Sequence, residues 1–238
     1  MGELRDVWVY LSATPLLHLT LTLAAFQFGS WVYAKGKMNP TLNPVLLAVV
    51  LIVAVLLVTG TRYDAYFEGA QFVHFLLGPA TVALAIPLYR QFERVRRSAL
   101  AVLVSILAGS TTAMLSAVGI GYVLSGSSDT LIALAPKSVT APVAMGIAEQ
   151  LGGLPSLTAV LVLITGITGA VLGPYVLTLI GVKDWAARGL AMGTASHGIG
   201  TARALQVNEI AGAFSGLAMG LNALATAMLL PLLWGFFF

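Results

Sequence analysis

The feature that most constrains this chain is its succession of long apolar segments, which leave little polar surface for contact with water. Among its 238 residues, 58% are hydrophobic and only 9% carry a charge, whereas soluble domains average about 25% charged residues. A membrane-spanning helix needs about 20 residues, so this length accommodates about eight membrane-spanning or re-entrant elements. The sequence therefore predicts an all-α polytopic membrane protein that forms one integral membrane domain over residues 1–238.

The apolar segments also predict where the individual elements lie. Unbroken spans are expected at residues 8–33, 43–60, 98–124, 157–180 and 210–234. An element at residues 71–89 contains Gly78-Pro79 and Pro87, and elements with polar interruptions are expected at residues 129–151 and 185–207. Lysine and arginine gather in the loops around Lys35 and Lys37 and at residues 90–97, and placing these loops in the cytoplasm puts the N-terminus outside. The later loops carry too little charge to orient the C-terminal half.

Polar and cationic residues interrupt two of the apolar segments at positions where such residues are costly. Residues 135–142 read Ala-Pro-Lys-Ser-Val-Thr-Ala-Pro, and residues 193–203 read Gly-Thr-Ala-Ser-His-Gly-Ile-Gly-Thr-Ala-Arg. A lysine or arginine at the centre of a membrane helix costs roughly 2.5–3.5 kcal/mol, so an ionisable residue at that depth is first interpreted as functional. Paired segments broken by glycine and proline are also the best sequence indication of a transporter's binding site.

The residues in the two interruptions suit the binding of a small anion. A half-helix beginning near Ala141 and another beginning near Ile199 would each direct N–H groups and a partial positive charge toward the interruption. Polar and cationic side chains add further donors, while Gly193, Gly198 and Gly200 let the backbone approach a ligand closely. The candidate substrate-binding residues are Lys137, Ser138, Thr140, Thr194, Ser196, His197, Gly198, Thr201 and Arg203, together with Asn222 in the last span.

Each candidate also has a structural interpretation. Lys137 fits an ordinary loop, Arg203 can extend its side chain to the membrane surface, and Asn222 can simply bond to a neighbouring helix. His197 is a candidate for proton coupling because imidazole ionises near neutral pH, although a buried histidine with satisfied hydrogen bonds is the commoner case. Glu149 is a second coupling candidate, but its position near a predicted helix end favours the membrane interface.

Other chemistries find no support in the sequence. It contains no nucleophile elbow, phosphate-binding loop, dinucleotide fingerprint or metal-site spacing of histidine and carboxylate residues. We therefore expect neither an enzyme nor a cofactor nor a bound metal ion. The net charge of +3 comes from a few loop residues and does not indicate a nucleic-acid partner. With no cysteine, the chain forms no disulfides.

The sequence also repeats itself at an offset of 57 residues. The matches pair Pro79 with Pro136, and a weaker third copy places the region of Pro136 on that of Gly193. This predicts three units of a broken element followed by an unbroken one, at residues 70–124, 127–181 and 184–238, with residues 1–60 as possible scaffold spans. If the broken elements cross the membrane, neighbouring units are parallel; if they are re-entrant hairpins, the units are inverted and the hairpin turns approach from opposite faces. The sequence leaves both arrangements open.

Several strings in the chain resemble the LrgB/CidB family of bacterial inner-membrane proteins. They are Asn43-Pro44, Leu77-Gly78-Pro79-Ala80-Thr81-Val82-Ala83 with Pro87-Leu88-Tyr89, Pro136-Lys137-Ser138-Val139-Thr140 with Pro142, residues 193–203, and Gly212-Ala213. The resemblance covers nearly the whole chain from residue 43 onward, and Ser196 departs from the alanine expected there in much of the family. It implies a protein of the bacterial cytoplasmic membrane that forms a homodimer or pairs with a small partner of the LrgA/CidA type.

The resemblance implies two competing functions. One is holin/antiholin-like modulation of murein hydrolase export and cell lysis; the other is transport of small carboxylates of the glycolate, glycerate, pyruvate or lactate type. We expect transport of a 2-hydroxy- or 2-keto-monocarboxylate, because a holin has no obvious use for two cationic, glycine-broken elements at membrane depth. The expected mechanism is alternating access, elevator-like and coupled to H⁺ or to a cation such as Na⁺. The holin-like function is the alternative.

Overall fold

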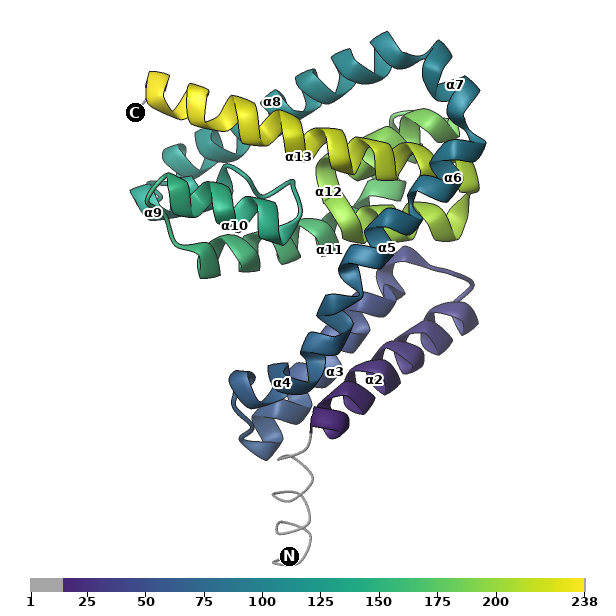
Figure 1. Cartoon of the computed structure of the whole chain (residues 1–238), viewed down its shortest axis with the longest axis vertical. Coiled ribbons are helices and arrows are strands. Elements are labelled where there is room, and N and C mark those ends of the chain that lie inside the picture. The colour runs from purple at the N-terminus through teal and green to yellow at the C-terminus, as the bar shows by residue number, and fades with distance from the viewer. Residues whose placement is uncertain (1–14, 238) are drawn as a thin grey trace, which may run out of the picture. The chain divides into compact units, whose positions relative to one another are not determined.

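The structure is a computed structural model that describes residues 15–237, and every regular element in that range is helical (Figure 1). The segments long and apolar enough to cross a membrane are Pro40–Thr59, Tyr63–Arg90, Ala99–Val123, Pro155–Leu179 and Glu209–Gly235. These helices confirm the expected all-α membrane protein, whereas the expected number of about eight elements is not confirmed. Residues 8–14 of the predicted first span lie outside the described residues.

The described helices form two compact units, which divide between Ala83 and Leu84. The first unit contains α2 (Pro15–Lys35), the 3-10 turn η1 (Pro40–Leu42), α3 (Pro44–Thr59), α4 (Tyr63–Phe75) and α5 (Leu77–Ala83). Within it, α2 packs against both α3 and α4. A single membrane domain over the whole chain stays a prediction.

Local capping explains where α3 begins and ends. Asn43 Oδ1 accepts hydrogen bonds from the main-chain N–H groups of Val45, at 2.9 Å, and Leu46, at 3.2 Å. Pro44 fits the first helical position because no N–H donor is needed there. At the other end, Gly60 takes the left-handed conformation with φ 66°, which terminates the helix.

The second unit contains both polar interruptions. Its helices are α6 (Ala85–Arg90), α7 (Phe92–Arg97), α8 (Ala99–Val123), α9 (Ser128–Leu134), α10 (Ala141–Gln150), α11 (Pro155–Leu179), α12 (Trp185–Val207) and α13 (Glu209–Phe237). Helix α12 packs against the three long apolar helices α8, α11 and α13. Alanine, glycine and serine are common among the buried residues of these helices, and such small side chains allow close helix packing in a membrane.

The first interrupted element folds back on itself. Residues 135–140, called the first turn below, separate α9 from α10 without forming a helix. After α10 the chain lies beside α9 again. This follows from the position of Gly153, where an added side chain would collide with Ile132 of α9. Helices α9 and α10 therefore form a hairpin rather than one continuous crossing.

The second interrupted element, α12, also folds back. Within it, His197 has φ 42° and ψ −133°, which lies outside the helical region. A side chain added at Gly200 would come within 2.7 Å of the Met192 carbonyl oxygen, although a straight helix would separate these residues by about 12 Å. Likewise Trp185 and Arg203 line one small cavity, whereas about 27 Å would separate them along a straight helix. Helix α12 is therefore a hairpin that bends at residues 194–198, called the second turn below.

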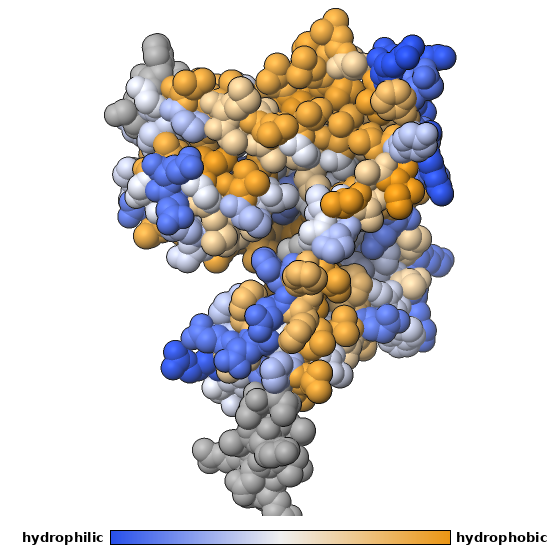
Figure 2. All heavy atoms as spheres, viewed as in Figure 1, coloured by the Kyte–Doolittle hydropathy of each residue, from blue (hydrophilic) through white to orange (hydrophobic). Residues whose placement is uncertain are grey.

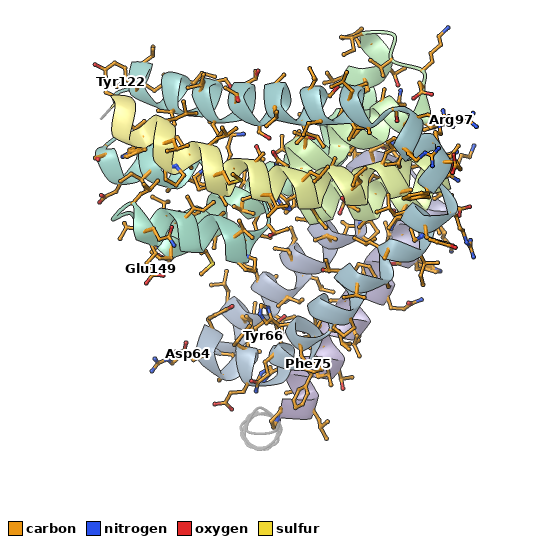
Figure 3. All side chains as sticks on the ribbon, turned by 45° about the horizontal axis from the view of Figure 1, so that its top comes forward. Asp64, Tyr66, Phe75, Arg97, Tyr122 and Glu149 are labelled. Atoms are coloured by element: carbon orange, nitrogen blue, oxygen red, sulfur yellow. The ribbon has the colours of Figure 1, made fainter. Side chains whose placement is uncertain are left out.

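The two hairpins enter the second unit from opposite ends. Both ends of α12 lie beside α6 and α7. Arg94 pairs at 2.9 Å with Asp184, directly before α12, and Arg90, the last residue of α6, pairs at 3.2 Å with Glu209, the first residue of α13. Helix α8 begins after α7, and its 25 residues extend about 37 Å before α9 starts. Figure 3 shows Arg97 at one end of this unit and Tyr122 and Glu149 at the other.

The two turns therefore approach each other from opposite sides, which is the arrangement expected for inverted units. The 57-residue offset places residues 137–140 on residues 194–197, so the two turns also occupy corresponding positions in the sequence. Both interrupted elements return to the end from which they start, which is the geometry expected of re-entrant hairpins.

Because the chain has no native cysteine, single cysteines can test this topology. Lys183 and Gln206 are exposed near the two ends of α12, and we expect a membrane-impermeant maleimide to label cysteines there from the same side as Arg97→Cys. Ser127→Cys and Gly152→Cys, at the two ends of the first hairpin, should be labelled from the other side. Labelling of Lys183→Cys and Gln206→Cys from opposite sides would mean that α12 crosses the membrane.

Candidate functional site

A buried asparagine joins the two turns. Asn222 lies within α13 and is 1% exposed. Its Nδ2 donates hydrogen bonds to the carbonyl oxygens of Ser138 in the first turn, at 3.1 Å, and of Thr194 in the second turn, at 3.0 Å. Its Oδ1 accepts a hydrogen bond from Ser110 Oγ of α8. One side chain therefore links α8, α13 and both turns.

An amide side chain suits this position for a physical reason. Where a helix breaks inside a membrane, its main-chain groups have no water to bond to, and each unpaired group costs several kcal/mol. An amide carries two donor hydrogens and an acceptor oxygen. Asn222 therefore satisfies two main-chain carbonyls at once and still accepts from Ser110, which a hydroxyl or an apolar side chain cannot do.

His197 forms the bend of the second turn. It is 5% exposed, and its Nε2 lies 3.0 Å from the Val162 carbonyl oxygen of α11. Because a carbonyl oxygen only accepts, Nε2 carries a proton and donates it in this hydrogen bond. In the neutral ring, Nδ1 is then the nitrogen that can take up a proton. A φ of 42° is strained for a residue with a side chain, so surrounding contacts must hold the bend.

Hydrogen bonds to α13 hold this bend. Thr201 Oγ1 donates to the His197 carbonyl oxygen at 2.8 Å. Because that bond uses the single proton of the Thr201 hydroxyl, Ser215 Oγ, 2.9 Å away, donates to Thr201 Oγ1. Ser215 belongs to α13, so the second turn is attached to the same helix that carries Asn222.

The first turn presents a lysine beside the start of α10. Lys137 is half-buried, and its Nζ lies 3.4 Å from Ser138 Oγ. Thr140 is the residue before α10, but its side chain caps none of the helix N–H groups. The N–H groups at the start of a helix have no acceptor within the helix and carry a partial positive charge. The first turn therefore combines an ammonium group with the positive end of a helix.

Helix α11 contacts both turns at the level of Val162. The Val162 side chain packs with Val139 of the first turn, and its carbonyl oxygen accepts from His197 of the second turn. One helical turn further along, a side chain added at Gly166 would come within 2.6 Å of His197 Cε1. The glycine therefore leaves the space that the imidazole ring occupies.

The structure brings most of the predicted site residues to the two turns. Those in the turns are Lys137, Ser138, Thr140, Thr194, Ser196, His197 and Gly198, with Thr201 one helical turn later and Asn222 between the turns. Within residues 15–237, no three histidine, aspartate or glutamate side chains form a group that could hold a metal ion.

Two predicted residues lie away from the turns. Arg203 is near the ends of α12, where it lines a cavity of about 40 Å³ together with Trp185 and Arg188. Glu149 is exposed in the last turn of α10, at the outer end of the first hairpin (Figure 3). The hairpin shape explains both positions, because residues that follow a turn move away from it along the returning helix. Roles for Arg203 and Glu149 in binding or coupling stay predictions.

Two serines of the site are not singled out by the sequence. Ser110 and Ser215 are both buried, the first bonded to Asn222 and the second to Thr201. A serine in an apolar helix commonly bonds to a carbonyl of its own helix, so its presence alone does not indicate a polar site. Only their contacts with other helices reveal these two.

Replacing Asn222 with leucine should destabilise the protein. The change removes the donor to two buried carbonyls and the acceptor for Ser110, and we expect a loss of about 1–3 kcal/mol, measured as a lower melting temperature in detergent. Thr158→Val is the control, because the buried Thr158 hydroxyl bonds only to the Leu154 carbonyl at the start of its own helix. Equal melting temperatures for the two variants would contradict a bridging role for Asn222.

Gly166→Ala should disturb the second turn. Its methyl group would lie too close to His197 to be accommodated without movement, and such overpacking costs about 1–3 kcal/mol. Gly146→Ala in α10 is the matched control, because nothing lies within 4 Å of the added group and alanine favours a helix by up to about 1 kcal/mol. The melting temperature should fall for Gly166→Ala and stay or rise for Gly146→Ala; the opposite order would contradict the packing described.

Comparison with known proteins identifies the family. Residues 22–236 match the LrgB-like family. The chain is 37% identical to YxaC of Bacillus subtilis, described as an uncharacterized protein, over 91% of this chain and 94% of that protein. It is 34% identical to the holin-like protein CidB of Staphylococcus epidermidis, over 94% of this chain and 96% of the relative.

A further relative is also named holin-like protein CidB. The holin-like protein CidB of Staphylococcus aureus strain Mu50 is 34% identical over 92% of this chain and 95% of its own length. No solved structure matches the chain. The family match spans most of the sequence, and the relatives are similar over nearly their full lengths, so the chain belongs to the LrgB-like family of membrane proteins.

Proposed function

We propose that this protein is a secondary transporter of small carboxylates in the bacterial cytoplasmic membrane. The observation that carries the proposal is that two polar turns approach from opposite ends of one unit and are bridged by Asn222. In transporters built from inverted repeats, substrate sites lie near the membrane midplane, where broken helices of the two repeats meet. The two hairpins have the arrangement that such a site requires.

The donors around the turns favour a small monoanion. Lys137 supplies one cation, and the start of α10 supplies N–H groups beside it. A carboxylate is an acceptor-only group with two oxygens, and charge-assisted hydrogen bonds to lysine and to a helix N-terminus suit it. In the opposite turn, the Thr194 hydroxyl is the proposed partner of a neighbouring hydroxyl or keto oxygen, whereas Ser196 Oγ lies against Gly169 of α11. The proposed substrates are therefore 2-hydroxy- or 2-keto-monocarboxylates of the glycolate, glycerate, pyruvate or lactate type.

The Asn222 bridge suggests how access alternates. Its two donor bonds reach different hairpins, so one bond can open while the other holds. A hydrogen bond exchanged for water changes stability by only about 0.5–1.5 kcal/mol, a barrier that thermal motion and substrate binding can overcome. We extend this to an elevator-like movement in which the second unit carries both turns.

A proton is the favoured coupling ion. His197 lies in the second turn, and with Nε2 donating to Val162 its Nδ1 is available to take up a proton. Neither turn contains an acidic residue, whereas hard cations prefer sites that include carboxylate oxygens. Proton uptake at His197 would add positive charge beside the carboxylate and so link proton and substrate binding.

Uptake of radiolabelled glycolate or pyruvate into proteoliposomes tests the proposal. We expect saturable uptake that an inward proton gradient stimulates, and a loss of about tenfold or more in Lys137→Gln, because one charge-assisted hydrogen bond is removed. His197→Gln should lose stimulation by the gradient but retain counterflow exchange, because the amide can still donate to Val162 without binding a proton. Lys183→Gln, an exposed cation outside the turns, is the control and should transport normally.

Uptake that does not saturate, or that Lys137→Gln leaves unchanged, would overturn the transport proposal. The names of the CidB relatives support a second candidate, a holin-like modulator of cell lysis. That function predicts an unselective leak of small solutes that does not saturate. It also predicts that Lys137→Gln and His197→Gln leave lysis phenotypes intact.

A further inference from the structure

A cavity that is open to the surface lies where α6, α7 and the start of α8 meet. The chain bends at Gln91, with φ −101° and ψ 11°, and again at Ser98, with φ −105° and ψ 11°, so three helices meet at an angle. The cavity between them has a volume of about 490 Å³. It is lined by Arg90, Gln91, Glu93, Arg94, Arg97 and Ser98.

The lining has an excess of cationic side chains. The lining contains three arginines and one acidic residue, Glu93. Two of the arginines form exposed ion pairs, Arg90 with Glu209 and Arg94 with Asp184, and each pair uses one of the five N–H groups of its guanidinium. Within residues 15–237, Arg97 forms no ion pair. The cavity therefore offers one uncompensated guanidinium and several further donors to an anion.

Apolar side chains adjoin this cationic cavity. Phe92 is 55% exposed, Tyr89 81% and Leu100 76%. Leu100 lies in the first turn of the apolar helix α8, which is long enough to cross a membrane. Figure 2 shows hydrophilic residues gathered at the upper right beside a broad hydrophobic surface. Clustered arginine at the end of a span is typical of the cytoplasmic interface. The cavity thus combines anion donors with a surface suited to hydrocarbon.

We propose that this cavity binds the headgroup of an anionic phospholipid from the cytoplasmic leaflet. Arg97, Arg90 and Arg94 donate to the phosphate oxygens, and the acyl chains lie along the exposed apolar face of α8. Basic pockets beside membrane helices on the cytoplasmic side recognise anionic headgroups in this way. An anionic lipid can use both the arginines and the adjoining apolar surface, whereas a soluble phosphate would use the arginines alone.

The test measures the melting temperature of the full-length protein in detergent as lipid is added. Dioleoylphosphatidylglycerol should stabilise the protein in a saturable manner, and dioleoylphosphatidylcholine should not. Arg97→Gln should weaken the apparent affinity for phosphatidylglycerol about fivefold, the effect of one cationic side chain near an anionic lipid. Arg96→Gln is the matched control, because it removes the same charge from the same helix at a residue that does not line the cavity.

Glu93→Gln provides a change in the opposite direction. It removes the one acidic residue of the lining and should strengthen the affinity, a gain that misfolding cannot mimic. Equal stabilisation by the two lipids, or equal weakening by Arg96→Gln and Arg97→Gln, would overturn the cavity as a specific lipid site. Inorganic phosphate that stabilises the protein equally and abolishes the effect of phosphatidylglycerol would also overturn it, in favour of a soluble anion.

Discussion

The whole site depends on one constraint, which is that main-chain polar groups exposed by a broken helix inside a membrane must find partners within the protein. The turns of the two hairpins meet at a buried amide, and Asn222 donates a hydrogen bond to one main-chain carbonyl oxygen in each turn. The bridge fixes the distance between the turns and gives their polar side chains a common location. Without it, the same polar residues would be isolated and costly.

Close packing makes this arrangement possible. Glycine in α11 leaves space for the imidazole of His197, and a threonine–serine pair attaches the strained bend to α13. Small side chains bring helices close enough for these short hydrogen bonds to form. The apolar helices therefore do more than cross the membrane, because their smallest residues determine where the polar groups meet.

Local signals in the sequence predict much of the fold. The start of α3 follows from Asn43 and Pro44, and the half-helix expected near Ala141 begins at that residue. The return of each hairpin is not predictable in this way. The α12 hairpin depends on the φ angle of His197, and the α9–α10 hairpin brings together Gly153 and Ile132, which are separated in the sequence by the whole of α10. For the same reason Arg203, six residues after His197, lies at the other end of the hairpin.

A last consequence concerns what Asn222 recognises. Both of its donor bonds end on carbonyl oxygens of the main chain, at Ser138 and Thr194, and not on their side chains. Any residue at these two positions presents the same carbonyl, so the side chains of the turns can be exchanged while the bridge is kept. The link between the two turns is thus made by main-chain atoms, whereas the side chains that give each turn its polar character are separate from it.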